Sequence, residues 1–411
     1  MFFHNKWIKR RKNMRKRIMV IDCSVNTLKT IKKLNIKVIC IEKEQKKQLK
    51  DLMNSDDIYF EIDYKDITLL KKEVGKILIK YPVDAILSFT GDGQNAVVAL
   101  QEEYPLNKYK QSDQIKLFKN QCNLRNLLNR NNFSYVHVKL INSKEALIEF
   151  ANENGFPFIL KPCIETGSKV AKKISTFKEV YELLDKENPA TLIAEDYQEG
   201  VEISVETFSF NRKHYVVGIT DKYTEPDFVT YGHSVPTTLN DELITEITLF
   251  VLDFLTLTGV VFGPCHIEIK MTAYGPKIIA AHCRTGGDQI VALHRFVSGV
   301  DLTQWTLDAI YTENWQKYDV SQQYRAAAVF YLRFQPNKKI KKLNFQNADE
   351  TIVAYKCNIE EGVGTTETNS LKDEHGFIIT KGRNVEEAVE NCRLAIQTIE
   401  IEYAEGIFPD S

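Results

Sequence analysis

Charged side chains occupy every second position of two apolar segments near the middle of this 411-residue chain. His266, Glu268 and Lys270 alternate with isoleucines, and His282 and Arg284 end a second apolar segment. Side chains alternate between the two faces of a β-strand, so each charged set shares one face. Charged groups within apolar strands are unfavourable unless they are paired or line a solvated cleft. The pattern predicts a β-hairpin with a polar floor, where Glu268 could hold Mg²⁺. The alternative is an internal salt-bridge network of Glu268, Lys270 and Arg284.

The N-terminal quarter of the chain alternates strands with helices. Short apolar segments at 18–20, 38–41 and 85–87 are separated by segments with helical spacing or a high content of charge. Strands interleaved with helices predict a parallel sheet that is covered on both faces. The turn at 89–93 follows the last of these strands, at the edge where such sheets bind ligands.

The rest of the chain is predicted to be helical first and then rich in strands. Residues 111–185 have helical patterns, interrupted by an apolar strand at 157–162. Antiparallel hairpins are expected over 201–220 and over 260–281, with a helix at 240–258 between them. The region from 325 onward is expected to be α+β and to end in a helix near 385–402.

Composition excludes several classes of protein. The formal net charge is -1, so no overall basic field favours a nucleic-acid partner. No apolar stretch approaches about 18 residues, so we expect no membrane span. The eight cysteines are scattered, and we expect reduced thiols in a cytoplasmic protein. The basic segment 6–17 is interpreted as a disordered extension or as the result of a start codon placed upstream of Met14, with contact to an anionic surface as the alternative.

Two further segments have the chemistry of a nucleotide site. Lys161 ends an apolar strand and precedes a loop containing Gly167 and Ser168, a combination that suits a phosphate. Another apolar strand leads into Glu195 and Glu202, where backbone groups could read an adenine edge and a carboxylate could bind ribose hydroxyls. The alternatives are a surface lysine before a turn and an acidic turn after a strand.

In the order of these motifs the chain resembles the ATP-grasp superfamily of carboxylate–amine ligases, and within it the branch of L-amino-acid (dipeptide) ligases. The resemblance covers nearly the whole chain and is most specific at His266–Lys270, the Gly-Pro turn and the Arg-x-Gly-Gly-Asp segment 284–288. It implies an α/β and α+β chain with a three-subdomain ATP-grasp fold and an N-terminal Rossmann-like parallel sheet. The implied domains are an N-terminal domain, a lid, a catalytic subdomain and a C-terminal subdomain, at 14–110, 111–190, 191–324 and 325–405.

The resemblance also implies how ATP and a metal would bind. Lys161 would contact the phosphates, and Gly167 and Ser168 would cap them. Glu268 would ligate Mg²⁺ or Mn²⁺, and Glu202 would hold the ribose. The adenine would be taken by three neighbouring positions, Glu195, Tyr197 and Gln198.

The implied catalytic residues are Lys222 and His233, near the transferred phosphate, together with Arg284, Gly286 and Gly287, which would receive the substrate carboxylate. The implied reaction joins an amino-acid carboxylate to an amine through an acyl phosphate and releases ADP and phosphate. The implied partners are therefore small molecules, with neither nucleic acid nor membrane. A homodimer is compatible with the sequence.

This sequence departs from the family pattern at positions that matter for catalysis. Ala280 stands where a second metal carboxylate is expected, and Gln121, Thr230 and Cys283 (or His282) replace other expected polar residues. A methyl group or a neutral thiol is a poor ligand for a hard cation. The alternative function is therefore a degenerate ATP-grasp protein that binds nucleotide or metabolite without turnover.

The substrate pocket is expected to be built by loops near 90–92, 224–231 and 286–290. His294 and Arg295 lie beyond the Gly-Gly turn on an expected helix. Contact with an acidic substrate is one interpretation of these two residues, and a solvated helix face is the other.

Overall fold

The computed structural model describes residues 16–104, 106, 110–164, 171–186, 192–225, 229–345, 350–365 and 375–404. The loop positions Gly167 and Ser168 and most of the basic N-terminal segment lie outside these residues. Within the described part of the chain, no helix is both long and apolar enough to span a membrane.

The N-terminal region is the parallel sheet that the sequence predicts. Its strand order is β3-β2-β1-β4, with all pairs parallel. The strands are β1 (Arg17–Ile21), β2 (Lys37–Glu42), β3 (Ile58–Glu61) and β4 (Ala85–Leu87). The intervening helices are α2 (Val25–Lys33), α3 (Lys47–Lys50), α4 (Ile67–Lys80) and α5 (Gln94–Glu103).

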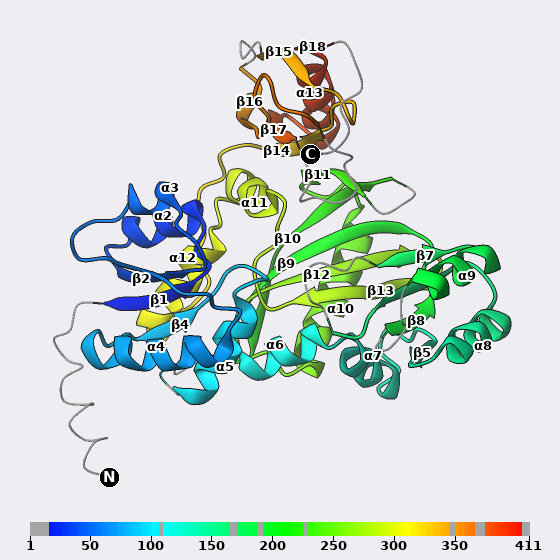
Figure 1. The fold of residues 1–411 in the computed structure, drawn as a ribbon, viewed down its shortest axis with the longest axis horizontal. Coiled ribbons are helices and arrows are strands. Elements are labelled where there is room, and N and C mark those ends of the chain that lie inside the picture. Colours follow the sequence, from blue (N-terminus) through cyan, green and yellow to red (C-terminus); the bar gives the residue numbers. More distant parts are fainter. Residues whose placement is uncertain are drawn as a thin grey trace.

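One of the helices that cover this sheet comes from far along the chain. Leu307 of α12 (Leu302–Tyr311) packs with Leu28 of α2 against Ile18 and Val20. The opposite face, with Met19, is covered by α4 and α5. Figure 1 shows α12, in yellow, beside the blue N-terminal sheet. This contact joins the N-terminal region to the strand-rich centre of the protein.

A second small sheet, with strand order β5-β8-β6-β7, lies in and next to the region predicted to be the lid and is called the lid sheet below. Its elements are β5 (Val138–Ile141), α8 (Lys144–Asn154), β6 (Phe158–Pro162), β7 (Lys172–Ile174), α9 (Phe177–Lys186) and β8 (Leu192–Asp196). Helices α6 (Ser112–Lys119) and α7 (Gln121–Arg130) connect it to the N-terminal region.

The centre of the protein is an eight-stranded sheet with the order β13-β12-β9-β10-β11-β14-β17-β16. Its strands are β9 (Val201–Phe210), β10 (Lys213–Thr224), β11 (Thr230–Val235), β12 (Phe262–Thr272), β13 (Gly275–His282), β14 (Ala326–Leu332), β16 (Ile352–Cys357) and β17 (Gly376–Gly382). Its associated helices are α10 (Asp241–Leu257), α11 (Ile290–Ser298) and α13 (Val385–Gln397). Both predicted hairpins are present, as β9–β10 and β12–β13.

The two faces of this sheet differ in polarity, as the alternation predicts. The odd-numbered residues Ile203, Ile267 and Ile269 pack with Val251 and Phe254 of α10. On the opposite face, the even-numbered positions of β9 and β12 include the charged residues Glu202, Glu268 and Lys270. Alternation along each strand therefore separates an apolar core from a polar floor.

Two expectations are wrong. The C-terminal helix ends at Gln397, and β18 (Ile399–Tyr403) follows and pairs with β15 (Ile340–Phe345). Its residues alternate between half-buried apolar side chains and exposed glutamates, which is the period of a strand. Cys122 and Cys163 form a disulfide, so these two are not reduced thiols. The fold brings their Cα atoms to 5.3 Å although 41 positions separate them in sequence.

We expect Phe208→Ala to destabilise the protein by about 3–5 kcal/mol, because it removes a fully buried ring from the centre of an aromatic cluster. The Phe208 ring centroid lies 4.7 Å from that of Trp315 and 5.7 Å from that of Trp305 on α12. Urea unfolding followed by circular dichroism measures the change. The control is Tyr274→Ala, at a side chain that is 92% exposed, and an equal loss in both variants would contradict the assignment.

Candidate active site

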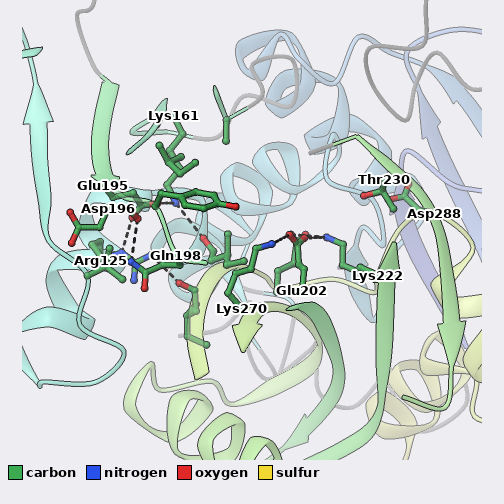
Figure 2. A pocket seen from close by; sticks show the side chains of 17 residues that line it. Arg125, Lys161, Glu195, Asp196, Gln198, Glu202, Lys222, Thr230, Lys270 and Asp288 are labelled. Carbon is green, nitrogen blue, oxygen red and sulfur yellow. Dashed lines mark hydrogen bonds and ion pairs between the residues drawn. The ribbon is translucent and has the colours of Figure 1, made fainter. Parts of the chain in front are cut away.

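A cavity of about 280 Å³ lies between the lid sheet and the polar face of the eight-stranded sheet. In Figure 2, Glu195 and Arg125 lie at one end of the cavity and Thr230 and Asp288 lie at the other, with Lys222 near Thr230 and Asp288. The cavity is lined by Arg125, Val136, Ile159, Lys161, Ala171, Glu195, Asp196, Tyr197, Gln198, Glu202, Lys222, Thr230, Glu268, Lys270, Ile278, Ile279 and Asp288. Six of the residues predicted to bind ATP or metal are in this list, so the fold brings them together.

The first end of the cavity is built on a buried carboxylate between two cations. Arg125 Nε lies 3.0 Å from Glu195 Oε2, and Lys161 Nζ pairs with Glu195 Oε1. Lys161 also donates to the carbonyl of Ile279 at 3.3 Å, and Arg125 donates to that of Ile278 at 2.9 Å. Burial opposes the charge on Glu195, but the two cations outweigh it and hold its pKa below the ordinary value. The Glu195 side chain therefore holds Arg125 and Lys161 in place.

The middle of the cavity floor is a row of alternating charges from three adjacent strands. Lys270 Nζ lies 3.2 Å from Glu202 Oε2, and Lys222 Nζ lies 2.5 Å from Glu202 Oε1 and 3.1 Å from Glu268 Oε2. Burial disfavours the ammonium form of Lys222, but Glu268 and Glu202 outweigh this and raise its pKa. Lys222 therefore stays charged at neutral pH.

From Glu268 the row continues to His266 and Glu206, and Glu206 holds the Gly-Gly turn. Glu268 Oε1 lies 3.3 Å from His266 Nε2, and His266 Nδ1 pairs with the buried Glu206. Burial opposes protonation of His266, but Glu206 outweighs this and raises its pKa to about 9. Glu206 Oε2 accepts a hydrogen bond from the Gly286 N–H at 3.0 Å. A Cβ at position 286 would lie 2.8 Å from Glu206 Oε1, so this close approach requires glycine.

A second cavity, of about 410 Å³, adjoins the first on the side of the N-terminal sheet. It is lined by Arg284, Gly286 and Gly287, and Asp288 is the residue that the linings of both cavities share. Arg284 donates to the carbonyl of Thr285 at 2.9 Å, while its buried Nε has no hydrogen-bond partner among the described residues. An anionic group in this cavity could accept that hydrogen bond.

The predicted pair Lys222 and His233 are opposite one another on β10 and β11. Burial lowers the pKa of His233 well below its ordinary value, and the charge of Lys222 adds to this effect. His233 is therefore neutral at physiological pH. His294 is not on a solvated face: it is buried, and its Nε2 lies 2.8 Å from Thr220 Oγ1.

Among the described residues, the carboxylate of the charge row that is predicted to ligate a metal is Glu268. Glu268 is opposite Ala280 on β13, and its other neighbours are His266 and His282. In the described ranges no group of three His, Cys, Asp or Glu side chains is arranged to hold a metal ion. One Mg²⁺ that keeps water and nucleotide oxygens as its other ligands fits Glu268, whereas a two-metal site does not.

Sequence reasoning missed three residues of the site. Glu206 shares the polar face of β9 with Glu202, so the same alternation could have identified it. Asp288 ends the Arg-x-Gly-Gly-Asp segment, but the family resemblance implies no role for its side chain. Arg125 carries no local signal, because its partner Glu195 lies 70 positions further along the chain.

The comparison with protein families identifies an ATP-grasp domain over residues 154–291. A curated relative, an uncharacterized protein of Sinorhizobium fredii, is 28% identical over 162 residues, covering 37% of this chain and 33% of that protein. The carbamoyl phosphate synthase large chain of Clostridium botulinum is 27% identical over 250 residues, covering 58% of this chain and 22% of that one. The chain thus spans a third or less of the length of these relatives.

Solved structures share the fold over almost the whole chain. The L-amino acid ligase from Bacillus licheniformis superposes with a TM-score of 0.79 at 16% identity, covering 96% of this chain and 100% of that one. The phosphoribosylglycinamide synthetase from Anaerococcus prevotii gives a TM-score of 0.71 at 16% identity, covering 95% and 100%. At such identities the likeness shows the fold. The prediction of an ATP-grasp fold is confirmed.

We expect Glu195→Gln to lower the free energy of unfolding at pH 7 by about 3–5 kcal/mol, because two buried cations lose their anionic partner. The folded-state pKa of Glu195 lies below its ordinary 4.5, so the stabilisation is full above pH 4.5 and is lost as the pH falls through the folded-state value. Urea unfolding at pH 7, 5.5 and 4 measures the difference from the parent protein. The exposed Glu102→Gln, which breaks a surface pair with Lys116, is the control and should change little. A difference between parent and Glu195→Gln that grows at acid pH would contradict this account.

Proposed function

From the premise that the chain carries an ATP-grasp domain within an ATP-grasp fold, we propose that it is an ATP-dependent carboxylate–amine ligase. It would form an amide or peptide bond through an acyl phosphate, with an L-amino acid as a substrate. The observation that carries the proposal is the pair of adjoining cavities that share Asp288. One contains the row of alternating charges with Lys222 and Lys270, and the other is lined by Arg284.

The charges of the first cavity suit a nucleotide that extends along it. Tyr197 and Gln198 line the end at the connection between lid and sheet, where the purine would lie. Lys161 and Lys222 each pair with a carboxylate, and both line the path toward Asp288. A triphosphate bound there would exchange some of these pairs for phosphate contacts, which are charge-assisted and strong. Glu268 would hold one Mg²⁺, which would neutralise phosphate charge.

The reaction requires activation of the carboxylate because direct amide formation would have to expel oxide. A carboxylate oxygen held at Arg284 would attack the γ-phosphorus, and ADP would leave. The amine nitrogen would then attack the carbonyl carbon of the acyl phosphate, inorganic phosphate would leave, and the nitrogen would lose a proton. Lys222 would stabilise the charge on the transferred phosphoryl group.

Asp288 would accept the proton from the amine. It lies at the junction of the cavities, and burial raises the pKa of its carboxyl group, against the opposing effect of Lys222 and Arg284. A raised carboxyl pKa makes the carboxylate a stronger base. Glu206 would hold the Gly286 backbone so that this turn keeps its position.

A nucleotide-binding protein without turnover is the second candidate. The observation that favours it is Ala280 directly opposite Glu268, where the family resemblance implies a second metal carboxylate. One metal ion can support binding more easily than it can support transfer of a phosphoryl group.

Phosphate release from ATP, Mg²⁺ and pairs of the twenty amino acids separates the two candidates. We expect release with at least one pair, and we expect Lys222→Met to reduce its rate about 10²–10³-fold, because a donor to the transition-state charge is lost. Lys213→Met is the matched control, since Lys213 is the exposed first residue of the same strand. ATP binding without release for any pair would favour the protein without turnover.

The metal assignment predicts that Glu268→Gln weakens Mg²⁺-dependent ATP binding by about tenfold or more. Calorimetric titration with ATP, with and without Mg²⁺, measures the metal-dependent part of the affinity. Glu242→Gln, at an exposed position of α10, should leave it unchanged. If Glu268→Gln leaves it unchanged as well, Glu268 does not ligate the metal. The complementary Ala280→Glu should strengthen metal-dependent binding, because it supplies a second carboxylate beside the first.

A further inference from the structure

The lining of the second cavity is rich in polar side chains. Four parts of the chain meet there: the start of α2, the loop after β4, the turn 284–289 with the start of α11, and the start of α12. Most of the side chains that line it carry a hydroxyl, amide or charged group, among them Ser24, Asn26, Thr90, Arg284, Gln289 and Arg295. An apolar substrate side chain would displace water from these groups without replacing their hydrogen bonds, which is unfavourable.

Arg295 adds a second cation to the cavity, on a different element from Arg284. It lies on α11, and its side chain is 40% exposed. Its nearest carboxylate is Asp301, whose Oδ2 lies 4.0 Å from Arg295 Nη1. That distance is longer than a hydrogen bond.

Asp301 is already satisfied by other donors. Its Oδ1 accepts hydrogen bonds from the N–H groups of Thr303 at 2.9 Å and Gln304 at 3.1 Å, which caps α12. Its Oδ2 accepts the hydroxyl hydrogen bond of Thr30 at 2.9 Å. The guanidinium of Arg295 therefore keeps donors that can serve a ligand in the cavity.

The start of α11 reinforces the preference for an anion. This nine-residue helix has no side-chain cap, and Val291 and Ala292 of its first turn line the cavity together with Arg295. Uncapped N–H groups at a helix N-terminus attract negative charge. The buried Arg284 Nε without a partner among the described residues is an independent sign that the cavity receives an acceptor.

We propose that the second cavity selects a small carboxylate substrate that carries a second anionic group, such as an acidic amino acid or a dicarboxylic acid. The carboxylate to be activated lies against Arg284 beside Asp288, and the second anionic group lies against Arg295. This inference rests on the proposed function for its reaction, but the binding of the ligand can be measured without turnover.

The test compares acidic amino acids with their neutral amides, which have nearly the same shape. The ligands are L-glutamate and L-aspartate against L-glutamine and L-asparagine, added to the full chain with ATP and Mg²⁺. Thermal stabilisation gives the half-saturating concentration, and phosphate release with each of the twenty amino acids as amine gives turnover. We expect an acidic ligand to bind about 10–100-fold more tightly than its amide. This is the gain in affinity that a hydrogen bond to a charged group typically provides.

Arg295→Gln should remove this difference in affinity. It should weaken the binding of the acidic ligand about 10–100-fold, while the affinity for the amide changes less than about twofold. Arg295→Lys should restore part of the preference because it restores the charge. Arg383→Gln removes an arginine that lies just before α13 and whose side chain is 87% exposed, and it should change the affinity for neither ligand.

Three outcomes would overturn the inference: amides that bind as well as the acids, a loss in Arg295→Gln that is equal for both, or no binding of any of the four ligands. Turnover with neutral amino acids alone would overturn it while supporting the proposed ligase. Acid-selective binding that depends on Arg295, without phosphate release, would support the inference while counting against the ligase.

Discussion

The structure depends on a row of largely buried charges that alternate in sign across an antiparallel sheet. Lys270, Glu202, Lys222 and Glu268 are linked in turn, and His266 connects the row to Glu206. Each charge would be unfavourable by itself at this depth, and removing one leaves its neighbour without a partner. The row therefore fixes the floor of one cavity and, through the Gly286 N–H, the wall of the next.

Much of this arrangement follows from alternation along single strands. The charged face of β12, both hairpins and the N-terminal parallel sheet were predictable because they depend on local periodicity. The residues that depend on distant contacts were not: Arg125 meets Glu195 only in the folded chain, and the Cys122–Cys163 pair has no spacing signal. The predicted helix to 402 failed because a short strand with alternating glutamates resembles a charged helix end until its partner β15 is known.

The second cavity exists because elements from distant parts of the chain converge on it. The start of α2 belongs to the N-terminal sheet, whereas α12 follows the central sheet and returns to pack on that first sheet. Asp301 couples the two by capping α12 while accepting the Thr30 hydroxyl of α2. The fold thus brings the start of α2 and the Gly-Gly turn to one cavity, which adjoins the other cavity at Asp288.

The orientation of a nucleotide in the first cavity tests the central claim most directly. A crystal structure of the full chain with Mg²⁺ and a non-hydrolysable ATP analogue would show it. The account predicts the purine against Tyr197 and Gln198, the phosphates along Lys161 and Lys222, and the terminal phosphate beside Asp288. A nucleotide bound elsewhere, or bound here with its purine beside Asp288, would contradict it.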